Sequence, residues 1–198
     1  MPYIIAGLGN PGEEYKNTRH NTGRIMIEHF RNANDFPDWK EDKKNKLLIS
    51  KEKIGKESVV LIEPDSFMNN SGKPLSSLIK SKKAAEKTVV IYDDIDLPLG
   101  VIKISYNRSS GGHNGLGSII RSLKTQEFIR VRIGVSKMSS KGTAKKPKGE
   151  EAVLKFLLGE FKKDEMLELK KIAKRANDAL LMIVNEGKEK TMGEFNRV

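Results

Sequence analysis

The sequence predicts an α/β fold, a single domain over residues 1–198 with a twisted mixed β-sheet flanked by helices. Short apolar segments bounded by glycine, proline or asparagine indicate strands, and two of these segments follow each other through a tight turn. Other strands alternate with segments of helical periodicity, which is typical of parallel pairing. The chain is long enough to bury one core and contains no internal repeat or linker. Both kinds of pairing together predict a mixed sheet.

The N-terminal segment predicts a strand, a turn and then a helix. Residues 3–8 form a short apolar run that ends at the turn formers of residues 9–12. Residues 13–21 are polar and lack amphipathic periodicity. We expect Thr22 to cap a helix, because apolar residues share one face of the segment that follows it. These residues are Met26, Ile27, Phe30 and Ala33.

The middle of the chain predicts a hairpin, a helix and a strand. Residues 47–62 are expected to form two antiparallel strands around a turn at residues 55–57. A helix is expected after Pro74. Residues 89–92 then form a short apolar strand that ends at two aspartates.

The C-terminal part predicts two more strands and two more helices. The strands are expected at residues 101–106 and 131–135, with a helix at residues 115–123 between them. Residues 137–149 carry five lysines together with glycine and proline, so we expect a mobile loop there. The last helix, from about residue 164 to residue 186, has apolar residues at helical spacing.

The chain is basic and contains no cysteine. Lys+Arg 37 against Asp+Glu 26 gives a net charge of +11 and a pI near 9.7. Such a surface attracts polyanions such as nucleic acids, although lysines also promote solubility, and charge alone does not choose between the two. Without cysteine, disulfides, thiolate zinc sites and cysteine nucleophiles are excluded. With no apolar run long enough to span a bilayer and no secretory signal, we expect a cytoplasmic protein without a membrane partner.

Residues 7–12 match the dinucleotide-binding pattern G-x-G-x-x-G directly after a predicted strand. That pattern requires a helix that begins at the glycines, so that its N-terminal amides meet the pyrophosphate. Residues 13–19 have no amphipathic stripe, and Glu13 and Glu14 would repel phosphate. The acidic residue expected at the end of a second strand is missing, because Asp35 follows a helix. A nicotinamide or flavin enzyme is therefore disfavoured.

The chain has three histidines, which limits the search for a general base. His29 lies within the amphipathic helix and is expected to be structural. His20 lies in a polar segment that enters this helix, and His113 lies in the glycine-rich turn of residues 109–115, where backbone can approach a ligand closely. No two histidines have the spacing of a zinc-binding H-E-x-x-H motif, so we expect no metal. By themselves, His20 and His113 fit surface positions as well as catalytic ones.

Asp93 and an asparagine-rich turn offer partners for such a histidine. Asp93 is expected at the end of an apolar strand, where open α/β sheets place functional groups. A carboxylate there can hold a histidine in one tautomer and stabilise its cation, or it can simply cap a turn. Residues 67–72 carry asparagine amides that can donate to an ester carbonyl or its oxyanion, or form an ordinary Asn-Ser-Gly turn. A serine esterase has no support, because no G-x-S-x-G motif is present.

Taken in order along the chain, these segments resemble the bacterial-type peptidyl-tRNA hydrolase family. The resemblance extends from residue 3 to about residue 135 and continues more loosely through residues 156–159. Each motif is weak alone, and their common order makes the resemblance specific. The motifs are Gly7–Gly12 with Tyr15 and Thr18–Gly23, Phe67–Gly72, Asp93–Pro98, Ser110–Gly115 and Arg132–Val135.

The family hydrolyses the ester that joins a nascent peptide to the 3′ ribose of tRNA, without a metal or cofactor. The resemblance therefore implies peptidyl-tRNA as the partner and His20 as the base that takes a proton from the attacking water. Asp93 would stabilise the working protonation state of His20, and Asn10 would meet the peptide backbone and so distinguish peptidyl-tRNA from free aminoacyl-tRNA. His113 is implied to be a loop neighbour. The implied binding residues are Tyr15, Phe67, Asn69 and Asn114, with Asn69 or Asn114 steadying the oxyanion or the water.

The sequence departs from the family where the tRNA 5′ phosphate is held. The family usually has a basic residue at the position of Ser105, where it works with Arg132. In this chain the nearest substitutes are Lys103 and Arg108. The family also often has lysine where this chain has Gly117. The phosphate clamp is therefore expected at Lys103, Arg108 and Arg132, supplemented by the lysines of residues 137–149.

One function of another class stays open, an RNA-binding protein without catalysis on the same fold, like the organellar relatives that assist intron splicing. The joint presence of His20, Asp93 and Asn10 with Asn69 and Asn114 favours the enzyme, because a binding scaffold has no chemical need for this set. We expect a monomer.

Overall fold

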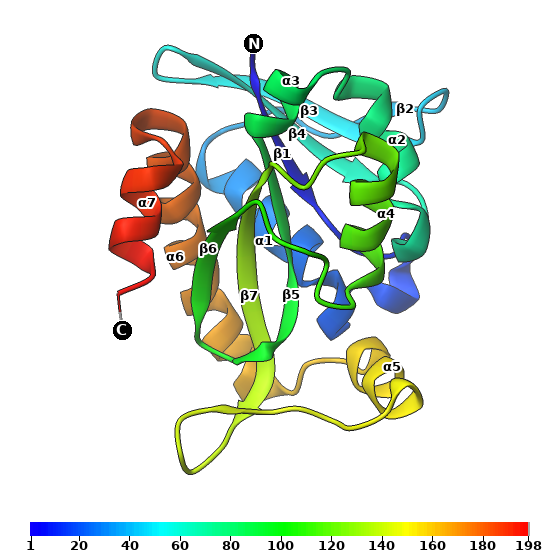
Figure 1. The fold of residues 1–198 in the computed structure, drawn as a ribbon, viewed down its shortest axis with the longest axis vertical. Helices are drawn as coiled ribbons and strands as arrows, with labels where there is room; N and C mark the ends of the chain where they lie inside the picture. The colour runs from blue at the N-terminus through cyan, green and yellow to red at the C-terminus, as the bar shows by residue number, and fades with distance from the viewer. Residues whose placement is uncertain (198) are drawn as a thin grey trace.

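The computed structural model describes residues 1–197. Its centre is one β-sheet in the order β2-β3-β4-β1-β5-β7-β6, with β8 paired to β7 outside this path (Figure 1). The strands are β1 (Tyr3–Gly7), β2 (Lys40–Asp42), β3 (Leu47–Ile54), β4 (Glu57–Pro64), β5 (Thr88–Pro98), β6 (Ile102–Tyr106), β7 (Ile129–Met138) and β8 (Ala144–Lys145).

Pairing within the sheet is mixed, as predicted. β1 lies parallel to both β4 and β5, and β5 lies parallel to β7. The β3–β4 hairpin and the β6–β7 pair are antiparallel. Because β4, β1, β5 and β7 run in one direction, their carboxyl ends meet at one edge of the sheet, where functional groups of α/β proteins gather.

Helices cover both faces of the sheet (Figure 1). The core on one side joins alternate strand residues such as Ile5, Ile91 and Val131 to the first and sixth helices. The core on the other side joins the intervening residues, such as Ala6 and Val90, to the second and fourth helices. The helices are α1 (Thr22–Ala33), α2 (Gly72–Leu78), α3 (Lys82–Glu86), α4 (Asn114–Leu123), α5 (Glu150–Leu158), α6 (Lys163–Glu186) and α7 (Lys188–Phe195).

Two glycines let the start of α1 lie directly against the sheet. A Cβ at Gly23 would lie 2.3 Å from the carbonyl oxygen of Ile91 and 2.4 Å from the backbone nitrogen of Leu8. A Cβ at Gly7 would lie 2.6 Å from the carbonyl oxygen of Gly23. Any larger residue would push α1 away from the ends of β1 and β5. This contact sets the position of the segment that precedes α1, which contains His20.

The first helix differs from the prediction at its start. Short 3-10 turns occupy Glu13–Tyr15 (η1) and Arg19–Asn21 (η2), and α1 begins at Thr22 itself, so Asn21 is the residue before it. The Thr22 hydroxyl donates to the carbonyl of Arg19 and does not cap the helix, which corrects the prediction for Thr22. The first α-helix thus starts ten positions after Gly12, which confirms that the dinucleotide-binding context is absent.

The strand before the two aspartates is longer than predicted. β5 continues past Asp93 and Asp94 to Pro98, so Asp93 does not end the strand. The pairing of β5 with β1 stops at Ile91, however, and its register with β7 shifts between Asp94 and Pro98. Asp93 therefore lies where β5 projects beyond β1, next to an irregular stretch that bends the strand.

Several short elements were not predicted from the sequence. The helix expected after Pro74 begins at Gly72, with a 3-10 turn (η3, Met68–Asn70) before it. β2, α3, α5 and α7 were not predicted. The predicted loop of residues 137–149 includes the end of β7 and the short strand β8, which pair through Lys137 and Lys145. The mobility of this segment stays a prediction.

Candidate active site

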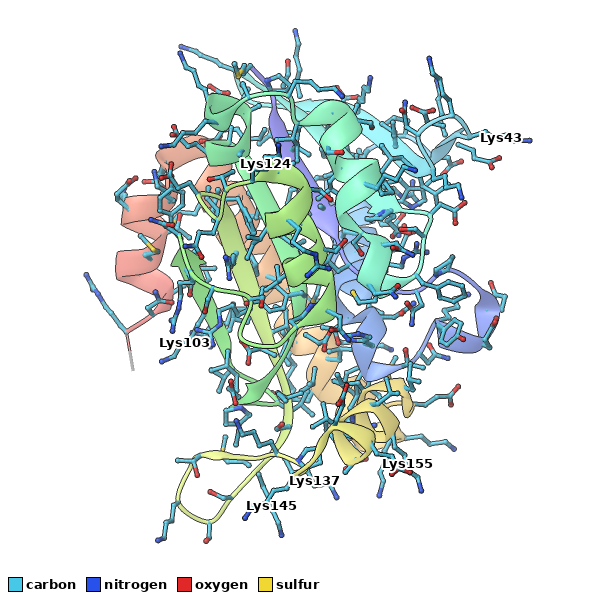
Figure 2. All side chains as sticks on the ribbon, turned by 45° about the vertical axis from the view of Figure 1, so that its right-hand side comes forward. Lys43, Lys103, Lys124, Lys137, Lys145 and Lys155 are labelled. Carbon is cyan, nitrogen blue, oxygen red and sulfur yellow. The ribbon has the colours of Figure 1, made fainter. Side chains whose placement is uncertain are left out.

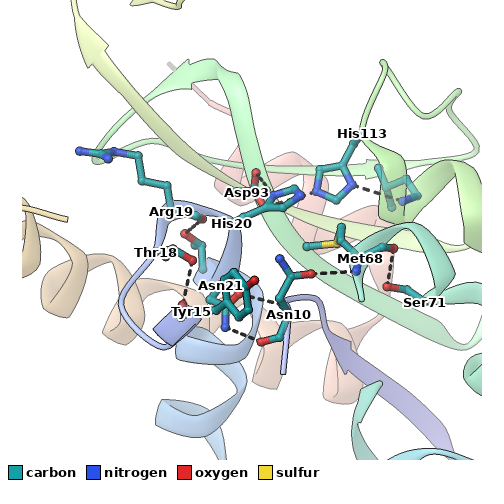
Figure 3. A network of polar contacts seen from close by, with 12 residues as sticks. Asn10, Tyr15, Thr18, Arg19, His20, Asn21, Met68, Ser71, Asp93 and His113 are labelled. Atoms are coloured by element: carbon teal, nitrogen blue, oxygen red, sulfur yellow. Dashed lines mark hydrogen bonds and ion pairs between the residues drawn. The ribbon is translucent and has the colours of Figure 1, made fainter. Parts of the chain in front are cut away.

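His20 and Asp93 form the centre of the site (Figure 3). η2 carries His20 to the carboxyl edge of the sheet, where Asp93 projects from β5. The Nδ1 atom of His20 lies 3.0 Å from each carboxylate oxygen of Asp93, and both residues are buried. This contact joins residues that are 73 positions apart, and it orients the His20 ring through a hydrogen bond at Nδ1.

His113 contacts the same carboxylate from the other side. Its Nε2 atom lies 3.3 Å from Oδ1 of Asp93, while its Nδ1 atom accepts a hydrogen bond from the backbone N–H of Leu116 at the start of α4. The rings of His20 and His113 are 5.1 Å apart between centroids, and Tyr92 packs edge-on against His113 at 5.0 Å. Asp93 thus holds two histidines, of which the sequence motifs indicated only one.

The electrostatics of this group follow from burial and charge. Burial opposes the ionisation of Asp93, but the two histidines outweigh it and lower the pKa of this carboxyl below its usual range. Burial likewise opposes the His20 cation, yet the charge and hydrogen bond of Asp93 prevail and raise the pKa of His20 above 6.5. Asp93 is therefore ionised at neutral pH, and His20 is a stronger base than an unperturbed histidine side chain.

His20, Asp93 and His113 are also the group within residues 1–197 whose spacing could hold a metal ion, since their ligand atoms lie within 4.8 Å of one another. The donor set of two imidazoles and one carboxylate is one that zinc accepts. The 3.0 Å separation of His20 from Asp93 also fits a hydrogen bond. The expectation that no metal is used stays a prediction.

Asn10 lies beside this centre and is held through its backbone and its side-chain oxygen. Its backbone exchanges two hydrogen bonds with the amide of Asn21, at 2.8 and 2.9 Å. Its Oδ1 atom accepts from the backbone N–H of Met68 at 2.8 Å. In Figure 3 the remaining amide nitrogen of Asn10 points toward His20. This group is a fixed N–H donor at the edge of the site.

Three of the predicted binding residues lie on the surface next to Asn10, here called the Tyr15–Asn69 surface, which consists of Tyr15, Phe67 and Asn69. The rings of Tyr15 and Phe67 meet edge to face at 6.4 Å, and the Phe67 side chain is 57% exposed. Asn69 is exposed in η3. A half-buried Tyr15 and an exposed Phe67 beside the amide of Asn69 are suited to stacking on a base or covering an apolar side chain.

A cavity of about 460 Å³ opens on the other side of His20 and Asp93. The predicted residues Asn114, Arg108 and Arg132 line it together with His20 and Asp93, whereas Asn10 and the Tyr15–Asn69 surface do not. Its remaining walls are the end of β5, the glycine-rich turn and one side of α5. The α5 residues that line it are Glu150, Val153, Leu154 and Leu157.

The predicted phosphate-clamp residues do not form one cluster. Arg132 donates to Asp94 from Nε at 2.7 Å, and Lys103 lies opposite Arg132 in the β6–β7 ladder. Arg108 lies in the loop after β6, and its carbonyl accepts from the buried Arg130. Ser105 is buried opposite Arg130. Of the three candidates, Arg108 and Arg132 face the cavity, and Lys103 does not line it.

Arg19 links α5 to the His20–Asp93 pair, a contact that the sequence did not reveal. Its guanidinium forms an ion pair with Glu165 at 2.8 Å and donates to the carbonyl of Gly159 at 3.1 Å. It also lies over the ring of Phe156, 4.6 Å from its centroid. Because Arg19 precedes His20, these contacts fix α5 relative to His20. The only signal in the sequence was that Arg19 lies next to His20 in the motif Thr18–Gly23.

The basic residues of the chain extend over several parts of the surface. Figure 2 shows Lys137, Lys145 and Lys155 projecting where α5 and the β7–β8 segment lie, with Lys103 on the β6 edge. Lys43 projects from the distant β2–β3 turn. Positive charge thus lies near α5 and the β7–β8 segment without being confined there. No helix within residues 1–197 is long and apolar enough to cross a membrane.

Comparisons with known proteins agree with the motifs and the geometry. Residues 4–198 match the family model described as peptidyl-tRNA hydrolase. A peptidyl-tRNA hydrolase of Thermoanaerobacter sp. is 38% identical over 195 residues, covering 98% of this chain and 99% of the relative. One of Listeria welshimeri is 39% identical over 178 residues, covering 89% and 90%.

Comparison with solved structures points to the same family. The crystal structure of peptidyl-tRNA hydrolase from Acinetobacter baumannii superimposes with a TM-score of 0.87 at 28% identity, covering 98% of this chain and 94% of that one. Its Arg119Gln mutant superimposes with a TM-score of 0.86. The non-catalytic RNA-binding alternative is not favoured by these findings. The chain belongs to the peptidyl-tRNA hydrolase family and hydrolyses peptidyl-tRNA.

Proposed function

We propose that His20 is the general base of this hydrolysis and that Asp93 holds it in its working state. The observation that carries the proposal is the 3.0 Å contact of His20 Nδ1 with both oxygens of a buried carboxylate. When Nδ1–H donates to Asp93, the neutral ring has its lone pair on Nε2, where it can accept a proton from water. The raised pKa of His20 favours this transfer.

The reaction then proceeds through ordinary acyl transfer. Water attacks the carbonyl carbon of the ester, and its proton passes to Nε2 of His20. The tetrahedral intermediate collapses as the carbonyl carbon separates from the 3′ oxygen of the ribose, which takes the proton back from the imidazolium. Asp93 stabilises the imidazolium in between. Side-chain amides of Asn114 or Asn69 donate to the oxyanion or orient the water, and Asn114 shares the cavity with His20.

Substrate recognition divides between the two sides of the centre. Asn10 is fixed by Asn21 and Met68, so its free amide can meet the peptide backbone at a defined position. Tyr15, Phe67 and Asn69 contact the acceptor end or the peptide. Peptide-backbone contact is the feature that free aminoacyl-tRNA lacks, so Asn10 provides the discrimination between the two substrates.

The tRNA phosphate is held by basic residues on the β6–β7 side. Arg132 and Arg108 face the cavity, and Lys103 lies opposite Arg132 in the β6–β7 ladder, so that these separate cations can contact the phosphate without the basic residue at Ser105. The pairing of Arg132 with Asp94 leaves part of the guanidinium for phosphate. The lysines of residues 137–149 add unspecific attraction. We further propose that the protein acts as a monomer in the cytoplasm, where its substrate arises.

The test is hydrolysis of labelled N-blocked aminoacyl-tRNA by the His20→Ala variant. We expect kcat to fall by about 10²–10⁴-fold, because general-base help of that size is lost. Binding of tRNA should stay within about threefold, since His20 is buried and the phosphate contacts are made by other residues. A variant with near-normal kcat would remove His20 from this role.

A further inference from the structure

A second buried acid–base pair, Arg24 with Glu63, lies beneath the site and has no part in the mechanism above. Nη1 of Arg24 lies 3.5 Å from Oε2 of Glu63, and both side chains are nearly enclosed. Burial raises the pKa of Glu63 to about 7 although Arg24 opposes the shift. Within residues 1–197, Nε of Arg24 has no hydrogen-bond partner. Such a pair gives little stability, because desolvation of the two charges offsets their attraction.

Arg24 lies between the two segments that carry the proposed peptide-binding groups. The turn after β1 carries Asn10, and the segment after β4 carries Phe67 and Asn69. Because β1 and β4 are parallel neighbours, both segments leave the sheet at the same edge. The hydrogen bond from Met68 to Asn10 joins them on the side of the substrate.

Arg24 contacts both segments through its backbone and its side chain. Its backbone N–H donates to the carbonyl of Leu8 at 3.1 Å. Its aliphatic stem packs on Gly9, where a Cβ would lie 2.8 Å from Cδ of Arg24. Its Nη2 atom donates to the carbonyl of Pro64, the last residue of β4. Arg24 therefore connects the base of the Asn10 turn, through its backbone and aliphatic stem, to the base of the Phe67–Asn69 segment, through its guanidinium.

We infer that Arg24 is a positioning residue that sets the distance between Asn10 and the Phe67–Asn69 segment, and that Glu63 orients its guanidinium. The inference rests on the proposed roles of Asn10 and Asn69 in holding the peptide and the acceptor end. Loss of Arg24 would misplace groups that bind the substrate in both ground and transition state. Such a change raises KM and leaves kcat nearly unchanged.

The experiment is steady-state hydrolysis of N-blocked aminoacyl-tRNA by Arg24→Met, with Arg31→Met as the matched control. Arg31 lies on the same helix and is similarly enclosed, with 11% of its side chain exposed against 15% for Arg24. It pairs with Glu28 and Asp38 and contacts neither segment. We expect KM to rise about tenfold in Arg24→Met with kcat within about threefold. Arg31→Met should keep KM within about twofold.

Two further variants separate positioning from folding. Arg24→Lys keeps the charge but lacks the planar fork, so we expect a KM between those of the wild type and Arg24→Met. In a protein that already carries Asn10→Ala, the effect of Arg24→Met on KM should be smaller. Adding Arg24→Met should then raise KM by less than about twofold. If Arg24→Met does not fold, Glu63→Gln replaces it, with KM raised about threefold. Unchanged KM in a folded variant, or KM effects that multiply in the double variant, would overturn the inference.

The role of His20 as the base and the role of Arg24 in positioning affect different kinetic constants. Loss of His20 is measured in kcat, and loss of Arg24 is measured in KM. An active His20→Ala variant would contradict the general base and leave the Arg24 comparison unaffected.

Discussion

Two buried acid–base pairs connect the segment after β1 to neighbouring strands, His20 to Asp93 of β5 and Arg24 to Glu63 of β4, and the pKa values of the two acids move in opposite directions. Asp93 meets His20 at 3.0 Å and His113 at 3.3 Å, and its pKa is lowered despite burial. Glu63 meets one guanidinium at 3.5 Å, and burial raises its pKa to about 7. The difference lies in the number and closeness of the cationic partners, because both carboxylates are almost fully buried.

The two pairs are therefore suited to different roles. A carboxylate that stays ionised at all physiological pH values keeps its histidine in one tautomer and is suited to catalysis. A carboxylate that titrates near neutrality is a poor catalytic partner, and it contributes position instead. Neutralising the two acids should therefore have different consequences.

The largest effect is expected for Asp93→Asn. An amide carries no charge to stabilise the imidazolium, and its N–H₂ can donate to Nδ1 of His20 and so force the ring proton onto Nε2. We expect kcat to fall by about 10²–10⁴-fold. Single-turnover hydrolysis of N-blocked aminoacyl-tRNA measures it. Glu63→Gln should keep kcat within about threefold, and equal losses of kcat in the two variants would remove the distinction between the pairs.

A smaller effect is expected on stability for Glu63→Gln. Because the folded-state pKa of Glu63 is raised from 4.5 to about 7, the native state binds more protons than the unfolded state in this range. The wild type therefore loses stability as pH rises from about 5 to 8, by at most about 3 kcal/mol from this group. The variant lacks this loss, so its unfolding free energy relative to wild type should increase over the same range.

Urea unfolding of the wild type and of Glu63→Gln at pH 5 and pH 8 measures this difference. Glu28→Gln is the control. The hydrogen bond from Arg31 is the main cause that lowers the pKa of Glu28, so Glu28 does not titrate near neutral pH as Glu63 does. The effect of Glu28→Gln should be about equal at pH 5 and pH 8. A pH-independent effect of Glu63→Gln would mean that Glu63 is ionised throughout.

The sheet and its main helices could be predicted because they rest on local periodicity. The hairpin of β3 and β4 and the long helix α6 follow their apolar spacing closely. β5 was predicted too short because Asp93 and Asp94 interrupt its apolar run, and the pairing with β7 that sustains it is not local. α7 was not predicted because half of its residues are charged and Thr191 is its buried residue.

The site could be predicted only in part, for the same reason. The family motifs named His20, Asp93, Asn10 and Asn114, and the structure brings them to one edge of the sheet. Sequence spacing could not reveal that Asp93 also contacts His113 across 20 positions. Nor could it reveal Arg24, which in an amphipathic helix has the pattern of a solvent-exposed residue but lies buried against Gly9 and Glu63.

The central claim, that His20 acts as a base held by Asp93, is tested most directly by the pH dependence of kcat/KM for the wild type and Asp93→Asn. Because Asp93 raises the pKa of His20 above 6.5, we expect the wild-type rate to fall as pH drops through a midpoint above 6.5. In Asp93→Asn the residual rate should fall through a lower midpoint, since burial then acts on His20 without the opposing charge. A wild-type rate that does not change between pH 5 and pH 9, or a midpoint that is the same in both proteins, would contradict the account.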